Sequence, residues 1–138
     1  MNEHTTTHCV LFPELFDKPL VAKFDQPHAS SDGGAVLLKA ADGKLRLTER
    51  LVAYLRDGRQ PGKVDHELIE LFQQRVFGIA CGYADCNDAA RLADDPIHKM
   101  LIGREPIHGD TLASQPTLSR FENSVSRTDL FRMGKVLG

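Results

Sequence analysis

The sequence has no tryptophan, little aromatic content and few cysteines. Aromatic residues make up 7% of its 138 residues, and there are three cysteines. Three cysteines cannot all pair, and a chain of this length seldom depends on a disulfide framework. Cys81 and Cys86 lie five residues apart, which is not the spacing of a zinc knuckle, and His4, His8 and Cys9 lie in a terminus without any secondary-structure pattern. We therefore expect no metal site in this chain.

The sequence also has no long apolar run and no leader peptide. Hydrophobic residues make up 41% of the chain, enough for a modest core. No run approaches the roughly 18 apolar residues of a membrane span. Met1 to His8 is polar and does not follow the basic-then-apolar pattern of a signal peptide. These features favour a cytoplasmic protein without a membrane partner.

A strong excess of charge of one sign is absent as well. The formal net charge is −2, which by itself does not favour a nucleic-acid ligand. The distribution is uneven, because residues 1–96 hold 11 Lys/Arg against 15 Asp/Glu, whereas residues 97–138 hold 6 against 4. The basic end of the chain is its C-terminal end.

The first third of the chain predicts one short strand followed by helices. Residues 1–19 have no regular pattern, and Leu20–Phe24 has the composition of a strand that Pro27 stops. The glycines after Ser31-Asp32 resemble a phosphate-binding loop, but the Lys-Ser/Thr ending of a P-loop is absent. Helix capping by Ser31 or Asp32 explains this segment better and predicts a helix to about Ala41.

Two further helices are expected in the middle of the chain. The first covers about Thr48 to Arg56. The second begins after Asp65, as its N-cap, and runs to Ala80 or Cys81, with Gly82 ending it. At 100° per residue its apolar side chains fill one broad face, and the opposite face holds polar side chains. The apolar set is Leu68, Ile69, Leu71, Phe72, Val76, Ile79 and Ala80, and the polar set is Glu67, Glu70 and Gln74.

Arg75 is the exception in this pattern, because it falls within the apolar arc. A charged group on a core face needs a partner. The turn that follows the helix carries two carboxylates, and we predict that Arg75 pairs with Asp85 or Asp88. Further on, Asp95 is the predicted N-cap of a helix that Pro96 starts.

The four aspartates of this region could suggest a two-metal hydrolase. They are Asp85, Asp88, Asp94 and Asp95. They lie at turns and helix starts, where aspartate is favoured for capping, and no general base of another type accompanies them. We therefore assign no catalytic residue to this chain.

The last predicted helix begins at Pro116 and has two distinct faces. Leu118, Phe121 and Val125 form its expected buried stripe. On or near the opposite face lie polar side chains of the types that contact phosphates and base edges in a DNA major groove. The candidate DNA-binding residues are Gln115, Thr117, Ser119, Arg120, Asn123 and Arg127. Taken alone, the pattern also fits an ordinary amphipathic surface helix.

Several stretches together resemble one protein family. They occur in a fixed order and end in a dozen contiguous residues, and they are Phe24-Asp25, Ser30–Gly34, Gln74–Tyr83, Asp85, Asn87-Asp88, Asp95-Pro96 and Leu112–Asn123. The chain from about Phe24 to Gly138 is similar to the start of the insertion-sequence "thirteen-eighty" family of DDE transposases, DDE domain group one.

The resemblance implies a helical N-terminal region that binds the terminal inverted repeats of the element as double-stranded DNA. It also implies a later RNase H-like domain in which three carboxylates hold two Mg²⁺ ions. The first of those acids is expected beyond Gly138, so the catalytic domain is expected to be missing. No Mg²⁺ or other cofactor is expected in this chain, which would have no enzyme activity alone.

The predicted fold is therefore mainly α, with a short N-terminal strand and a loose helix-turn-helix-like DNA-binding region. We expect an N-terminal arm at 1–29, a helical region at 30–103 and a loop with the DNA-binding helix at 104–138. Thirteen residues separate Ile102 from Pro116, more than the 3–4 of a tight helix-turn-helix. A free-standing regulator that inhibits transposition is the alternative. Possible partners are a second copy or the full-length transposase, and the protein would be nucleoid-associated.

Overall fold

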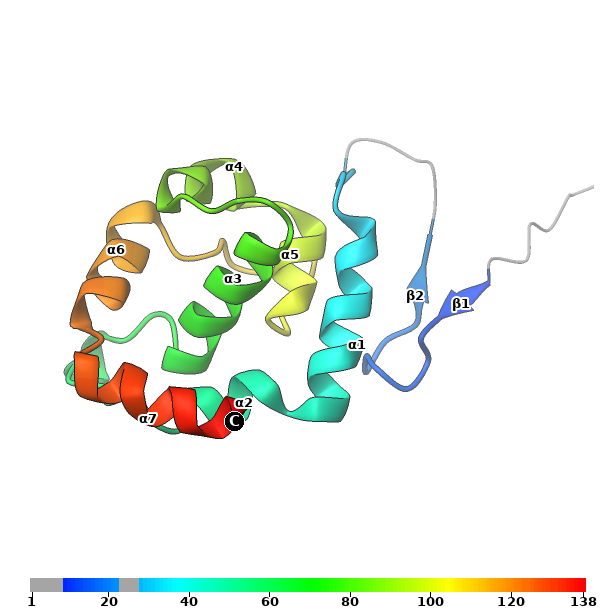
Figure 1. Cartoon of the computed structure of the whole chain (residues 1–138). Coiled ribbons are helices and arrows are strands. Elements are labelled where there is room, and N and C mark those ends of the chain that lie inside the picture. The colour runs from blue at the N-terminus through cyan, green and yellow to red at the C-terminus, as the bar shows by residue number, and fades with distance from the viewer. Residues whose placement is uncertain (1–8, 23–27) are drawn as a thin grey trace, which may run out of the picture.

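The computed structural model describes residues 9–22 and 28–138, and within them the chain is mainly helical (Figure 1). The strands are β1 (Val10–Leu11) and β2 (Leu20–Val21). The α-helices are α1 (Val36–Leu45), α2 (Leu47–Val52), α3 (Leu68–Ala80), α4 (Ala89–Leu92), α5 (Pro96–Leu101), α6 (Gln115–Ser124) and α7 (Arg127–Leu137). Three short 3-10 helices are η1 (Gly33–Ala35), η2 (Pro61–Lys63) and η3 (Cys86–Asp88). The predicted mainly α class is confirmed.

Helix α3 lies at the centre of the bundle and contacts α2, α5 and α6 (Figure 1). On one side, Leu71 joins a buried cluster with Leu118 and Phe121 of α6. On another side, Phe77 packs with Leu101 of α5 and with Ala35, the last residue of η1. The amphipathic pattern of the sequence thus becomes a helix with partners on several sides, which explains why its apolar arc is broad.

The short strand has a partner, contrary to the sequence-based expectation that residues 1–19 are irregular. β1 and β2 pair antiparallel, with Val10 opposite Val21 and Leu11 opposite Leu20. Two paired residues per strand are too few to produce the alternation by which strands are recognised in a sequence. Leu20 and Val21 therefore have a partner strand within the chain, and residues 23–24 of the predicted strand lie outside the described residues.

The first helical segment differs from its predicted form at both ends. It opens with η1, continues as α1 to Leu45 rather than Ala41, and Asp32 makes no side-chain cap bond. The Asp32 carboxylate instead accepts hydrogen bonds from the Tyr83 hydroxyl at 2.8 Å and from His98 Nε2 at 2.9 Å. This aspartate was predicted as a cap because capping is a local pattern, whereas its partners are more than 50 residues away in sequence.

Helix boundaries in the middle of the chain follow the predicted signals in part. α2 ends at Val52, four residues before the expected Arg56. α3 starts after Glu67 rather than after Asp65, because Glu67 and Glu70 form a reciprocal capping box. Gly82, with φ of 96°, ends α3 as predicted. Asp95 caps α5 as predicted, accepting from the backbone N–H groups of residues 97 and 98.

The described helices are short. None of them combines the length and the apolar character needed to cross a membrane.

Candidate nucleic-acid interface

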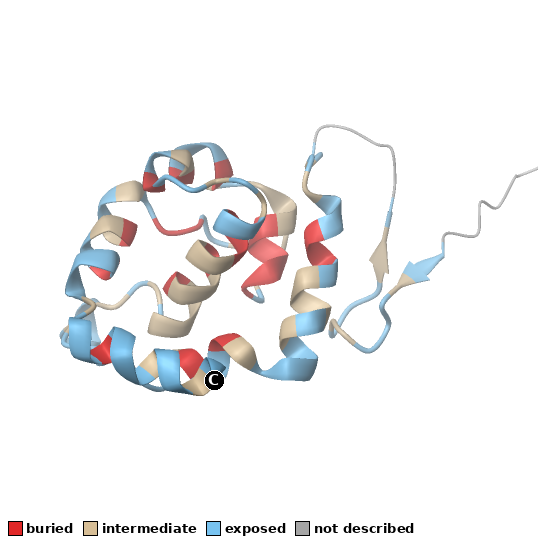
Figure 2. Ribbon diagram, in the orientation of Figure 1, coloured by how far each residue is buried: buried red, intermediate tan, exposed pale blue. Residues whose placement is uncertain are grey.

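Helix α6, which carries most of the predicted site residues, is anchored by its buried stripe. Leu118 is 2% exposed and Phe121 is 8% exposed, and both pack against the α3 side of the bundle. Val125 packs partly buried against the same cluster but lies just beyond the end of the helix. Figure 2 shows the buried residues of α6 on its inner side and exposed residues on its outer side. The predicted inner stripe is therefore confirmed.

The predicted polar residues of α6 lie at or near the surface. Arg120 and Asn123 are exposed, whereas Gln115, Thr117 and Ser119 are half-buried. The Gln115 amide donates to the Ser119 hydroxyl at 3.0 Å, and Arg120 donates to the Thr117 hydroxyl at 3.4 Å. The helix therefore presents a row of hydrogen-bonding groups in which Arg120 and Asn123 are the most accessible.

Arg127 lies on a different helix from the rest of the predicted set. α6 ends at Ser124, residues 125 and 126 are extended, and Arg127 is the first residue of α7. Ser126 and Asp129 form a capping box that starts the new helix. The prediction that Arg127 lies toward the C-terminal end of the α6 helix is wrong. The prediction extended the helical period of Leu118 and Phe121 past residue 124. The Ser126–Asp129 capping box, which starts a new helix, was not taken into account.

A groove of about 710 Å³ lies beside α6 and brings together residues distant in sequence. Arg120 lines it from α6, and Arg56, Arg59 and Lys63 line it from the segment between α2 and α3. Two carboxylates, Asp57 and Asp65, also line the groove. None of the predicted site residues belongs to this segment. The sequence feature that could have indicated this segment is the presence of three Lys/Arg residues within the eight positions 56–63.

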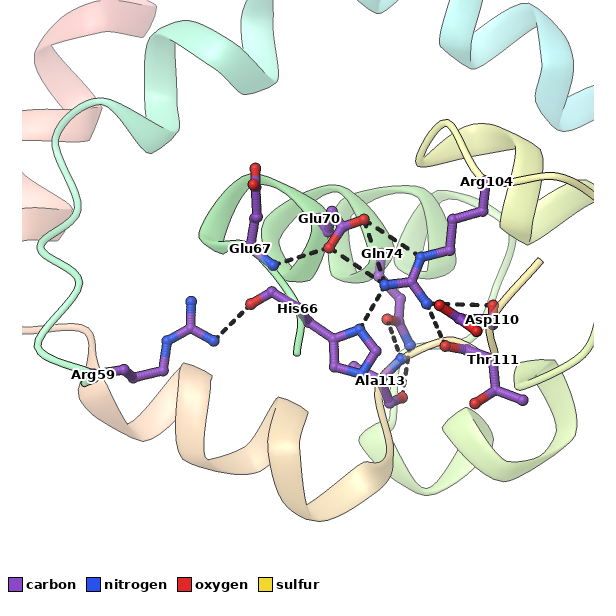
Figure 3. A network of polar contacts seen from close by, with 9 residues as sticks. All are labelled: Arg59, His66, Glu67, Glu70, Gln74, Arg104, Asp110, Thr111 and Ala113. Carbon is purple, nitrogen blue, oxygen red and sulfur yellow. Dashed lines mark hydrogen bonds and ion pairs between the residues drawn. The ribbon is translucent and has the colours of Figure 1, made fainter. Parts of the chain in front are cut away.

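One wall of the groove is held in place by two arginines (Figure 3). Arg59 pairs with Asp57 at 2.6 Å and donates to the backbone carbonyl of His66 at 2.7 Å. The His66 ring accepts a hydrogen bond at Nδ1 from Arg104 at 2.8 Å. The position of His66 therefore depends on both guanidinium groups.

Arg104 joins this wall to the segment that leads into α6. Its side chain, only 13% exposed, pairs with Glu70 of α3 at 3.4 Å. It also donates to the backbone carbonyls of Asp110 and Thr111, as Figure 3 shows. We call Arg104, His66 and Glu70, with the carbonyls of residues 110 and 111, the Arg104 network.

The buried side chain of Gln74 fixes the same segment two residues further on. Its amide nitrogen donates to the carbonyl of Ala113, and its amide oxygen accepts from the Ala113 N–H, both at 3.0 Å. Gln74 is 6% exposed and Ala113 is fully buried. The sequence-based placement of Gln74 on the solvent-facing side of α3 is thus wrong. An amide side chain can satisfy both polar groups of a peptide at once, which makes its burial favourable.

Arg75 has a carboxylate partner, but not one of the two predicted. It pairs with Glu122 of α6 rather than with Asp85 or Asp88. Its guanidinium also donates to the backbone carbonyls of Tyr83 at 3.4 Å and Ala84 at 3.0 Å. Arg75 therefore still binds the turn after α3, but through the backbone. Its ion pair adds a second connection between α3 and α6.

Three of the four aspartates of the middle region have structural partners. Asp85 caps η3 by accepting from the Asn87 N–H, Asp95 caps α5, and Asp94 pairs with Lys99 at 3.3 Å. In residues 9–22 and 28–138, no three His, Cys, Asp or Glu side chains lie close enough together to hold a metal ion. His4 and His8 lie outside the described residues. The donors of the described residues do not fit a magnesium site.

The pKa of His66 is lowered by burial and by the nearby Arg104 cation, while the Glu70 and Asp65 carboxylates partly oppose the shift and Arg59 adds to it. A histidine with a lowered pKa stays neutral in the folded protein at a pH where the unfolded chain binds a proton. The free energy of unfolding should therefore fall as the pH drops below the ordinary histidine value of about 6.5.

We predict that His66→Asn makes this pH dependence shallower, because the asparagine oxygen can accept from Arg104 without titrating. The measurement is the free energy of unfolding from urea titrations at several pH values from about 7 down to about 5. His108→Asn, at an exposed position, serves as the matched control. An unchanged slope in His66→Asn would show that His66 is not the group responsible.

Comparison with known proteins identifies the family. The model of the family "Transposase DDE domain group 1" matches residues 12–137. The chain belongs to this transposase family. No curated protein and no solved structure matches it. The resemblance found in the sequence is therefore confirmed, and the helical bundle described above is part of a DDE transposase region.

Proposed function

We propose that this transposase chain binds double-stranded DNA through α6 and the adjacent groove, and that it recognises the terminal inverted repeats of its element. The observation that carries the proposal is the position of Arg120. It is exposed on α6 and lines the groove together with Arg56, Arg59 and Lys63. Four cations against two carboxylates in a groove beside an exposed polar helix suit a ligand with a phosphate backbone and readable base edges.

In the proposed complex, α6 acts as the recognition helix. Arg120 and Asn123 are accessible, and these side-chain types make bidentate contacts to guanine and adenine in the major groove. Gln115, Thr117 and Ser119 lie on the same helix and add hydrogen-bonding groups. Arg127, at the start of α7, contacts the phosphate backbone. The 13 residues between α5 and α6 make this a looser arrangement than a helix-turn-helix with a 3–4-residue turn.

The test separates base contacts from phosphate contacts. Arg120→Ala should weaken binding to the inverted repeat by about 1–3 kcal/mol and change binding to a scrambled duplex little. Arg127→Ala should weaken binding to both duplexes alike and reduce the dependence of log K on log salt by about one unit. Binding titrations on both duplexes at two salt concentrations measure these effects.

Lys44→Ala is the matched control, because Lys44 is exposed in the last turn of α1 and does not line the groove. It should bind both duplexes as the unaltered chain does. If Arg120→Ala also binds the repeat with unaltered affinity, α6 is not the recognition helix.

A further inference from the structure

A second hollow, separate from the α6 groove, lies between α2 and α7. Its volume is about 540 Å³. Figure 1 shows α7 running beside α2, and these helices are in contact. The lining residues are Arg50, Ala53, Tyr54, Arg132, Lys135 and Val136. Three of these six carry a positive charge and none carries a negative charge, in a chain whose net charge is −2.

The three cations are not neutralised within the described part of the chain. Arg50, Arg132 and Lys135 form no ion pair with any described carboxylate. Arg50 donates to the carbonyl of Val136 at 3.5 Å, and the Lys135 ammonium lies 4.7 Å from the centre of the Phe131 ring. Both contacts leave the positive charge in place.

The nearby carboxylates are already engaged. Asp129 lies one turn before Arg132, but it accepts hydrogen bonds from the Ser126 hydroxyl and N–H in the capping box that starts α7. Those bonds are the main reason why the pKa of Asp129 is lowered, with Arg56 and Arg132 contributing. Glu49 of α2 pairs with Arg46. The hollow therefore keeps a net positive charge, which favours an anionic ligand.

We propose that the α2–α7 hollow binds phosphate groups of a DNA backbone, apart from the contacts of α6. Arg50, Arg132 and Lys135 donate to the phosphate oxygens, and the half-exposed Tyr54 at its rim adds a phenolic donor. The hollow presents cations and one hydroxyl, so its contacts are independent of base sequence. The proposal rests on the proposed function for the identity of its ligand, and it extends the DNA surface from α6 along α7.

The test uses the whole chain with Arg132 and Lys135 both replaced by glutamine. Glutamine favours a helix about as well as arginine or lysine, so α7 is preserved. Kd is measured on a 20-base-pair inverted-repeat duplex and on a scrambled duplex at about 50 and about 200 mM salt. We expect the affinity for both duplexes to fall by the same factor. The slope of log K against log salt concentration should be smaller in magnitude by about 0.9 for each phosphate that the variant no longer neutralises.

Arg50→Gln, on α2, should act in the same way. Lys18→Gln, an exposed lysine outside the hollow, is the matched control.

Two results would overturn this proposal. Either the variants bind both duplexes with the affinity and salt slope of the unaltered chain, or they lose affinity for the repeat only. The outcome for Arg120→Ala, measured on the same duplexes, decides the role of α6 separately. Failure of the unaltered chain to bind any duplex at low salt would overturn both proposals together. A loss of helicity in the glutamine variants is checked by circular dichroism, and Arg50→Gln, which changes no residue of α7, then decides the question.

Discussion

Replacing Gln74 with leucine is expected to lower the free energy of unfolding by about 2–4 kcal/mol, since each buried polar group left without a partner costs roughly 1–3 kcal/mol. The substitution keeps the side-chain volume close to that of glutamine but removes both hydrogen bonds to Ala113. Ala113 is fully buried, so water cannot replace the missing amide without a local opening. The cost therefore comes from the backbone N–H and carbonyl of residue 113.

The measurement is a urea titration of Gln74→Leu against the unaltered chain, with Gln60→Ala as the control. Gln60 is exposed and makes no side-chain cap bond at η2, so its removal should change the free energy of unfolding by less than about 0.5 kcal/mol. A similarly small change in Gln74→Leu would mean that the segment before α6 does not depend on this amide.

Local signals in the sequence predicted some of the helix starts and stops correctly. The Asp95-Pro96 start of α5, the Gly82 end of α3 and the Leu118–Phe121 stripe of α6 all lie where the sequence predicts them. Each of these signals acts within a few residues, through a cap, a backbone conformation or a helical period. Such features depend little on the rest of the fold.

Partners distant in sequence could not be predicted in the same way. Gln74 and Ala113 are 39 positions apart, and Arg75 and Glu122 are 47 apart. The sequence indicated that Arg75 needs a partner, and the nearest carboxylates in sequence were chosen. In the structure α6 lies against α3 and brings Glu122 closer. A buried amide and a surface amide look alike in a helical pattern, so Gln74 was assigned to the wrong face.

The groove next to α6 shows the same difficulty at the candidate site. The sequence predicts the polar residues of α6 from one contiguous stretch. The cations at positions 56, 59 and 63 belong to a segment about 60 residues earlier, and only tertiary packing brings them to the same groove as Arg120. Arg127, conversely, was grouped with α6 because the helical period was continued past Ser124, although a capping box places it on another helix.

Replacing Arg104 with methionine is expected to cost about 3 kcal/mol of stability, near the lower end of the range for breaking a buried ion pair because Glu70 keeps 23% of its side chain exposed. The substitution retains an unbranched apolar chain of similar length and removes every donor of the Arg104 network. Glu70 then lacks its cation, and the carbonyls of residues 110 and 111 lose a donor. Arg91→Met is the control, because Arg91 is exposed and contacts the Tyr83 ring without an ion pair to any described carboxylate.

Adding Glu70→Gln to Arg104→Met tests the physical cause of this loss. If an uncompensated carboxylate causes most of the cost, the double variant should be more stable than Arg104→Met alone, although one more native side chain has been changed. Combining Arg104→Met with Gln74→Leu should be less destabilising than the two separate losses added together. Both side chains hold residues 110–113, and a segment released by the first change has less to lose from the second. Strict additivity within about 0.5 kcal/mol would mean that the two side chains hold α6 independently.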